Sequence, residues 1–223
     1  MTGSISQIIN SIQSKIPQNV KLIAITKQVG LEPMEEAYKT GIRDFGENRL
    51  QEALSKQDKL NLPDINWHFI GHIQKNKAKK IIENFDWIHS VDSLALAKRL
   101  NRIAAELNCT PKVLLQVKVL PDPNKYGWEV AESIEDLEQL NRCDRLKIKG
   151  LMTILPLGLS AQETLSAFQN TKKLASTIAD KKYANLKMKQ LSMGMSGDYL
   201  QAIAAGATMI RLGRTIFGER QTA

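Results

Sequence analysis

The stretch LIAITKQVGLEPMEEAYKTG, residues 22–41, contains a strand followed by a helix and decides the fold class. Residues 22–26 form a short apolar run typical of a buried strand, whereas residues 32–40 have apolar side chains at helical spacing and stop at Gly41. No GxGxxG turn follows the strand, although an open doubly wound sheet would place its phosphate-binding turn there. The stretch therefore favours a βα unit of a closed barrel, with the open doubly wound sheet as the alternative.

The same alternation of strands and helices continues along the whole chain. Eight strands, each with a helix beside it, in 223 residues match what a TIM barrel needs. Isoleucines at helical spacing in residues 5–12 predict an additional N-terminal helix. The sequence thus predicts an α/β fold with one (β/α)8-barrel domain over residues 1–223. The other strands are expected at residues 44–45, 67–70, 86–89, 112–119, 148–152, 190–192 and 209–211, and the other helices at 47–60, 75–84, 93–107, 129–141, 161–179 and 198–205.

The composition is that of an ordinary globular domain. Hydrophobic residues make up 43% and charged residues 24%, and no low-complexity tract or linker divides the chain. The N-terminal segment lacks the apolar core of a signal peptide, and no stretch approaches the roughly 18 apolar residues that span a bilayer. We therefore expect a cytoplasmic protein without a membrane partner. Cys109 and Cys143 make neither a disulfide framework nor a metal site, so no metal is expected.

The net charge is strongly positive, +8 at pH 7. This charge allows a polyanionic partner such as nucleic acid, but it equally describes a merely basic surface. The densest basic run, KNKAKK at residues 75–80, continues into Ile81 and Ile82 as one amphipathic helix, which places most of its lysines on a solvated face. The run contains no aromatic residues to stack on bases, and aromatic residues make up only 5% of the chain. We expect no nucleic-acid partner.

Polar residues and methionines follow several strands at their C-terminal ends, where a barrel assembles its site. Structural charges would instead be scattered over the exteriors of the helices. These residues therefore predict a site at one mouth of the barrel. The series consists of Lys27, Asn48, His72, Met152, residues 192–196 and residues 211–214.

Two features of this series predict the ligand. Lys27 ends a buried strand, where partial desolvation favours the neutral amine that attacks an aldehyde, although its position alone fits equally well a lysine that extends to solvent. The turn SMGMSGD, residues 192–198, offers N–H groups and hydroxyls to an anion, and Gly213 and Arg214 follow the last strand. The loops after the last two strands are the usual phosphate site of this fold. Together these groups indicate pyridoxal 5′-phosphate (PLP), which carries an aldehyde and a phosphate on one ring.

The motifs LIAITK, FGENRLQE, WHFIGHIQKNK, KYGW, GLMTI, LSMGMSGD and TMIRLGRTIFG, in this order, resemble the YggS/PROSC family of PLP homeostasis proteins over nearly the whole chain. The resemblance implies a barrel similar to the N-terminal domain of alanine racemase, with PLP held as a Schiff base on Lys27. It also implies that Arg211 faces the pyridine nitrogen and keeps it unprotonated, which makes the ring a weaker electron sink. For the phosphate, the resemblance implies contacts with the backbone of Gly213 and Arg214 and with the hydroxyl of Ser196 and, to a lesser degree, that of Ser192. For the ring, it implies contacts with Asn48, Met152 and Met193. Ordinary core filling is the alternative for both methionines.

The resemblance leaves two classes of function to separate. Alanine racemase takes a second base, a tyrosine, from a C-terminal β domain, and this sequence ends at Ala223 without one. We therefore expect a monomeric, non-catalytic PLP-binding protein for PLP (vitamin B6) homeostasis and amino- and keto-acid balance, with PLP-dependent apo-enzymes as candidate partners. The alternative is a small PLP-dependent amino-acid racemase or related enzyme. For that alternative Tyr126 is the tyrosine to examine, and the role of His72 stays open.

Overall fold

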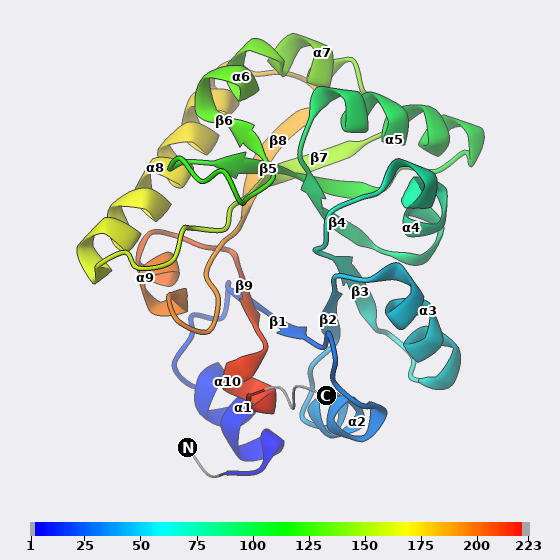
Figure 1. Cartoon of the computed structure of the whole chain (residues 1–223), viewed down its shortest axis with the longest axis vertical. Coiled ribbons are helices and arrows are strands. Elements are labelled where there is room, and N and C mark those ends of the chain that lie inside the picture. Colours follow the sequence, from blue (N-terminus) through cyan, green and yellow to red (C-terminus); the bar gives the residue numbers. More distant parts are fainter. Residues whose placement is uncertain (1–2, 220–223) are drawn as a thin grey trace.

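The computed structural model describes residues 3–219 and shows a closed barrel of parallel strands surrounded by helices (Figure 1). Within these residues, eight strands follow one another in the order β4-β3-β2-β1-β9-β8-β7-β5, and pairing of β4 with β5 closes the barrel. The predicted (β/α)8 barrel is confirmed. The strands are β1 Lys21–Ile25, β2 Asp44–Glu47, β3 Asn66–Phe69, β4 Trp87–Val91, β5 Lys112–Lys118, β6 Trp128–Glu129, β7 Lys147–Met152, β8 Leu186–Ser192 and β9 Met209–Leu212. The helices are α1 Ile5–Gln13, α2 Leu31–Lys39, α3 Leu50–Lys59, the 3-10 turn η1 Lys75–Lys77, α4 Ala78–Asn84, α5 Leu94–Glu106, α6 Val130–Glu135, α7 Leu137–Asn141, α8 Ala161–Asp180, α9 Tyr199–Ala204 and α10 Arg214–Phe217.

Most predicted elements are present, with some ends shifted. The additional N-terminal helix is α1, which begins with a capping box at Ser4. The helix expected from residue 47 begins only at Leu50, because Glu47 is the buried last residue of β2. The helix expected over 129–141 is divided at Asp136 into α6 and α7.

Two apolar layers stabilise the barrel. Alternate residues of β1 divide between them, because both faces of the strand are buried. Leu22 and Ala24 belong to the layer between the strands and the outer helices, whereas Ile23 and Ile25 point into the barrel. The inner layer also contains Met152, which therefore combines core filling with a place beneath the mouth of the barrel.

Two glycines allow neighbouring strands to approach closely. A Cβ atom at Gly150 on β7 would overlap the backbone carbonyl of Gln190 on β8. Gly71, two residues after the end of β3, lies in the same way against the carbonyl of Asn48, which follows β2. Since any larger side chain would force backbones apart, these positions require glycine.

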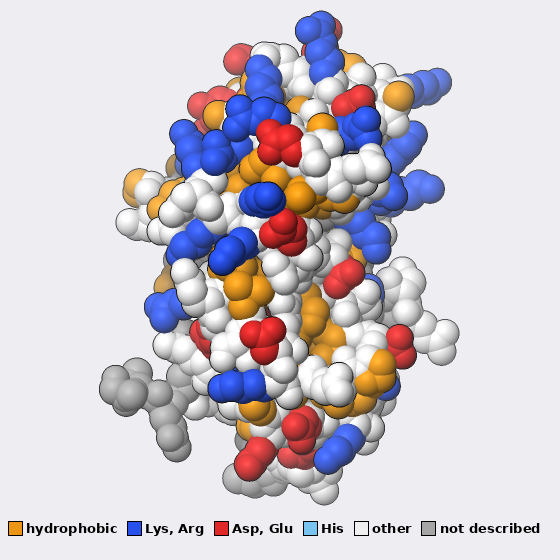
Figure 2. Space-filling model, turned by 90° about the vertical axis from the view of Figure 1, so that its right-hand side faces the viewer, with side chains coloured by type: hydrophobic (Ala, Val, Ile, Leu, Met, Phe, Trp, Pro, Cys, Tyr) orange, Lys and Arg blue, Asp and Glu red, His pale blue; other side chains and the backbone are white. Residues whose placement is uncertain are grey.

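Apart from the buried Lys56 and Arg211, the basic residues among those described are at least partly exposed. Figure 2, which shows the side of the molecule that carries α4 and α5, has Lys and Arg side chains gathered in its upper half with acidic side chains among them. Lys79 and Lys80 are exposed on α4, as predicted, but the lysine run begins in the 3-10 turn η1 and not in a continuous helix. No helix within residues 3–219 combines the length and the apolarity needed to cross a membrane.

Candidate functional site

A cavity of about 700 Å³ opens at the C-terminal ends of the strands. The segments that line it are far apart in the sequence, and the parallel barrel brings them together because equivalent strand ends meet at one mouth. Seven of the nine sequence-predicted site residues line this cavity, and Ser192 and Met193 do not. The seven are Lys27, Asn48, Met152, Ser196, Arg211, Gly213 and Arg214.

Lys27 is a half-buried residue that lies two positions after the end of β1. The residues on either side of it are anchored. The carbonyl of Thr26 accepts a hydrogen bond from Lys56 Nζ at 2.6 Å. Gln28 has a φ of 61°, in the left-handed region that residues other than glycine seldom occupy, and its N–H donates to Glu52 Oε1 at 2.5 Å. These contacts fix the direction in which the chain leaves β1 and therefore the position of Lys27.

Lys56 is a buried cation behind this segment. Its ammonium lies 2.7 Å from Glu47 Oε1 and 2.7 Å from Glu52 Oε1, so with the Thr26 carbonyl all three donors have acceptors. Glu47 is fully buried, and burial raises its pKa, although hydrogen bonds from Lys56 and Thr26 act in the opposite direction. Sequence reasoning missed this cluster because it placed Glu47 in a helix. The i,i+4 spacing of Glu52 and Lys56 was the available signal.

The turn after β8 and the start of α10 form another part of the cavity wall. Ser196 Oγ accepts a hydrogen bond from the N–H of Thr215 at 3.2 Å, which joins the turn to α10. A Cβ atom at Gly197 would meet open space, and Gly213 precedes α10 without a side-chain cap. A hydroxyl, backbone N–H groups and the exposed cation of Arg214 are thus gathered in one place. Such a set of donors suits a phosphate group.

Arg211 on β9 presents a buried cation to the cavity and is 3% exposed. Its Nη1 donates to Ser192 Oγ at 2.7 Å, and its Nη2 donates to the carbonyl of Thr153 at 2.8 Å. Burial lowers the pKa of Arg211 to about 10, and the charge of Asp198 acts in the opposite direction. Burial likewise raises the pKa of Asp198, which also lines the cavity. Arg211 is therefore a cation at neutral pH, held by two acceptors.

Ser192 and Met193 lie outside the cavity wall. Ser192 is fully buried, and its hydroxyl lies between Arg211 Nη1 and His89 Nδ1, 2.9 Å from the latter. Met193 is fully buried in the outer apolar layer, which is the core-filling alternative. Neither residue therefore lines the cavity, and Ser192 instead forms a hydrogen bond with Arg211.

His72 and Tyr126 form a stacked pair that is not part of the cavity lining. Their ring centroids are 3.8 Å apart with an interplanar angle of 15°, and His72 Nδ1 lies 3.1 Å from Asp92 Oδ2. Tyr126 is 56% exposed. Among residues 3–219, no tyrosine lines the cavity and no group of His, Cys, Asp and Glu side chains could hold a metal ion.

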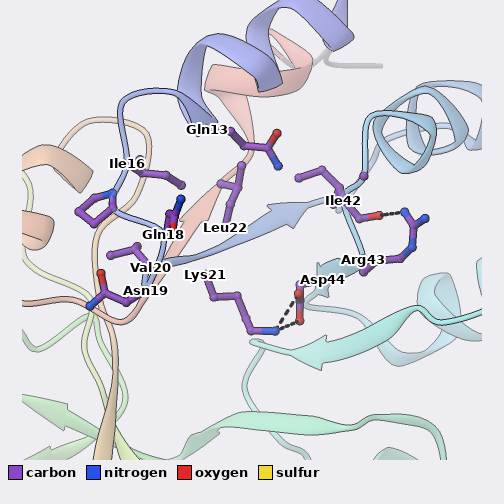
Figure 3. A pocket seen from close by; sticks show the side chains of 12 residues that line it. Gln13, Ile16, Gln18, Asn19, Val20, Lys21, Leu22, Ile42, Arg43 and Asp44 are labelled. Carbon is purple, nitrogen blue, oxygen red and sulfur yellow. Dashed lines mark hydrogen bonds and ion pairs between the residues drawn. The ribbon is translucent and has the colours of Figure 1, made fainter.

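A second cavity of about 510 Å³ opens at the N-terminal end of β1 (Figure 3). Lys21 and Asp44 face each other there, with Lys21 Nζ 2.7 Å from Asp44 Oδ1. Arg43 is turned back to the backbone and donates to the carbonyls of Ile42 and Tyr38 at 2.9 and 2.8 Å. This cavity contains none of the sequence-predicted site residues.

The fold and the cavity together define a class of protein, a barrel of the alanine racemase N-terminal type with a lysine after its first strand. The sequence profile of the family described as "Alanine racemase, N-terminal domain" matches residues 2–221. Alanine racemase from Clostridium difficile 630 shares the fold, with a TM-score of 0.79 at 17% identity over 98% of this chain and 57% of its own.

Much nearer relatives carry one name. The pyridoxal phosphate homeostasis protein of Synechocystis sp. PCC 6803 is 54% identical over 214 residues, 96% of this chain and 97% of the relative. The protein of the same name from Escherichia coli K12 is 36% identical over 92% of this chain and 87% of the relative. PipY of Synechococcus elongatus PCC7942, in a structure with PLP bound, has a TM-score of 0.92 at 48% identity and covers 96% of this chain and 100% of its own. The chain belongs to the alanine racemase N-terminal domain family and, within it, to the pyridoxal phosphate homeostasis proteins. The resemblance found in the sequence is confirmed.

Proposed function

We propose that this protein binds PLP covalently through Lys27 and serves PLP homeostasis without catalysing a reaction of its own. One observation supports the proposal most strongly. The same cavity is lined by Lys27 and by three residues that can donate hydrogen bonds to an anion, Ser196, Gly213 and Arg214. PLP supplies an electrophilic aldehyde carbon and a dianionic phosphate on one ring. The PLP-bound structure of PipY, at 48% identity, supports the same cofactor here.

The cavity residues fit the cofactor in charge and in shape. Lys27 provides the amine, and the apolar side chains of Ile25, Met152 and Ile154 provide walls for a ring. Arg211 provides a cation that has no lone pair to accept a proton. Its positive charge opposes protonation of any ring nitrogen that it faces. A ring held in that way withdraws electrons weakly, so Arg211 favours holding the cofactor over using it.

The acid and base groups around the cavity also favour a non-catalytic role. The carboxyl side chains that line the cavity are those of Asp198 and Glu219. Asp198 Oδ1 already accepts the N–H of Met195 at 2.5 Å. No tyrosine of the described residues lines the cavity, so we assign none of them as a racemase-type second base.

The covalent claim is tested by reduction and peptide mapping. The protein as purified should absorb visible light as a yellow complex, and borohydride followed by mass spectrometry should find a pyridoxyl group on Lys27. Lys27→Ala should remove the colour and the adduct without loss of helix content by circular dichroism. Lys112→Ala, which changes a half-buried lysine at the opposite end of the barrel, is the matched control and should keep both. An adduct on another lysine, or none, contradicts the proposal.

The non-catalytic claim needs a separate measurement. The PLP-loaded protein should racemise or deaminate common amino acids far more slowly than roughly 1 per second, the lower range of ordinary enzyme turnover. Turnover at that rate with any common amino acid would favour the racemase alternative.

We further propose that residues 1–223 act as a single domain, that the protein is a cytoplasmic monomer, and that PLP-dependent apo-enzymes receive its cofactor. The continuous barrel from β1 to β9 supports the single domain. Light scattering coupled to size-exclusion chromatography should give a mass near 25.0 kDa. A mass of twice that value at micromolar concentration would contradict the monomer.

A further inference from the structure

A continuous chain of hydrogen bonds runs through the barrel interior and ends at Arg211. His68 Nε2 lies 2.8 Å from Asp44 Oδ1, and His68 Nδ1 lies 2.9 Å from His89 Nε2. His89 Nδ1 lies 2.9 Å from Ser192 Oγ, which accepts from Arg211 Nη1 at 2.7 Å. The five residues come from five strands, β2, β3, β4, β8 and β9. The chain therefore crosses the barrel from the N-terminal end of β2 to the wall of the cavity.

The chain is almost entirely withdrawn from water. His68, His89 and Ser192 are each 0% exposed. Polar groups in such a place lose their hydration, and well-packed apolar side chains of similar volume often give equal or greater stability. Stability alone therefore does not explain why two imidazoles fill the barrel next to an apolar cluster of Ile23, Leu114 and Met209.

The direction of the hydrogen bonds is determined from the Asp44 end. Lys21 Nζ lies 2.7 and 2.8 Å from the two carboxylate oxygens of Asp44 (Figure 3). Although burial raises the pKa of Asp44, hydrogen bonds from His68 and Lys21 outweigh that effect and lower it. An ionised carboxylate can only accept, so His68 donates its Nε2–H to Asp44. In a neutral His68, Nδ1 is then an acceptor and takes the Nε2–H of His89.

The hydrogen bonds keep the same direction from His89 to the cavity wall. In a neutral His89, Nδ1 accepts, so the Ser192 hydroxyl donates to it and offers its lone pairs to Arg211. Burial lowers the pKa of both imidazoles, and for His89 a protonated His68 and the charge of Arg211 would lower it further, to well below its ordinary value. The charged groups that act on His68 are Asp44 and Asp86, which raise its pKa, and Lys21, which lowers it. Both imidazoles are therefore neutral Nε2–H tautomers at neutral pH.

We propose that Ser192, His89, His68 and Asp44 are positioning residues, which hold the Arg211 guanidinium at the cavity wall in one orientation toward the cofactor. The proposal rests on the proposed function for its ligand, and on the hydrogen-bond chain for its geometry. If the chain ran in the other direction, His89 Nδ1–H and Arg211 Nη1–H would both point at Ser192 Oγ. The Ser192 hydrogen would then lose its acceptor in His89. The carboxylate at the far end therefore selects the arrangement in which the Ser192 hydroxyl hydrogen has His89 as its acceptor and the lone pairs of Ser192 Oγ face Arg211.

The first test measures the tautomers and needs no cofactor. The protein has three histidines, so long-range ¹H–¹⁵N spectra resolve each imidazole, with exposed His72 as the internal reference. His68 and His89 should both be neutral Nε2–H tautomers at pH 7 in protein freed of PLP. A Nδ1–H tautomer or an imidazolium at either residue would overturn the proposal.

The second test removes links of the chain that lie away from the cavity. Asp44→Asn and His89→Phe should each speed hydrogen exchange of the Arg211 guanidinium roughly tenfold or more, since its acceptor Ser192 becomes mobile. The Kd for PLP should rise roughly tenfold, and the absorption maximum of the bound cofactor should shift, while the adduct still forms on the same lysine. Asp44→Asn preserves the shape of the side chain and keeps the test usable if His89→Phe does not fold. Thr171→Val, which removes a buried hydroxyl bonded within its own helix α8, should change none of these quantities.

The outcomes separate the two proposals. A lower melting temperature with unchanged Arg211 exchange and an unchanged cofactor spectrum would mean that the chain is only structural, and it would overturn the positioning role. If the unmodified protein forms no adduct, the proposed function fails. The exchange rate of Arg211 in protein without PLP then still decides whether the chain positions it.

Discussion

Replacing the buried cation Lys56 by methionine should destabilise the protein strongly at neutral pH. Methionine keeps most of the volume of the side chain but donates no hydrogen bond. Glu47, which is 0% exposed, would keep only the Thr26 hydroxyl as a donor, at 2.6 Å. A buried carboxylate without its cation is so unfavourable that Glu47 would take up a proton instead.

The size of the destabilisation follows from the free energy needed to protonate Glu47. A glutamate has an ordinary pKa of about 4.3, and each pH unit above it adds about 1.4 kcal/mol to the free energy of protonation. Protonating Glu47 at pH 7 thus costs about 4 kcal/mol, within the range of about 3–5 kcal/mol seen when one partner of a buried ion pair is removed. At pH 5 the same step costs only about 1 kcal/mol. Since Lys56 lowers the pKa of Glu47 in the unmodified protein, its removal raises that pKa further, and the folded variant gains stability as the pH falls.

Urea unfolding followed by circular dichroism at pH 7 and pH 5 measures both numbers. We expect Lys56→Met to lose about 3–4 kcal/mol of unfolding free energy at pH 7 and about 1 kcal/mol at pH 5, relative to the unmodified protein at each pH. Lys59→Met, an exposed change on the same helix α3, should stay within about 0.5 kcal/mol. Adding Glu47→Gln to Lys56→Met should remove the pH dependence. A loss below about 1 kcal/mol at pH 7, or one that is equal at both pH values, would refute the reasoning.

Three other substitutions test the barrel and the site. Gly150→Ala should lower the unfolding free energy by about 3 kcal/mol or prevent folding, because the new Cβ overlaps the Gln190 carbonyl, and thermal melts will show it. Arg211→Ala should weaken PLP retention during dialysis without abolishing the adduct on Lys27 found by mass spectrometry. Gly213→Asp should weaken binding of PLP much more than binding of pyridoxal, which lacks the phosphate, and paired absorbance titrations with the two ligands compare these losses.

The sequence predicted the fold well wherever one physical signal dominated. The buried strands β1 and β5 are continuous apolar runs and were found within one residue at each end. Failures occurred where tertiary contacts decide. The strand β8 begins at Leu186, four residues before its prediction, because Lys187 and Lys189 alternate toward solvent and dilute the apolar signal. The two-residue strand β6 owes its existence to pairing with Val117 and Lys118 and has no pattern of its own.

The site was predictable to the extent that it follows from strand ends. Lys27, Ser196 and Gly213 lie within four residues of the ends of their strands, and parallel closure alone brings them to one mouth. The supporting groups were missed because they lie inside strands or across them. His68 and His89 read as strand residues among apolar neighbours, and nothing in a single sequence tells that both point into the barrel and lie 2.9 Å apart.

The buried charge of Arg211 connects the interior of the barrel with the proposed role of the protein. Burial has not removed the charge of this guanidinium. With a pKa of about 10, its protonated form outnumbers its neutral form about a thousandfold at pH 7. The fixed acceptors Ser192 Oγ and Thr153 O hold this cation in place before any ligand enters. A cofactor ring that meets a preorganised cation keeps its nitrogen unprotonated and stabilises negative charge on carbon poorly. These contacts thus build a rigid holder for a cofactor, and they support the retention of PLP as the centre of the proposed function.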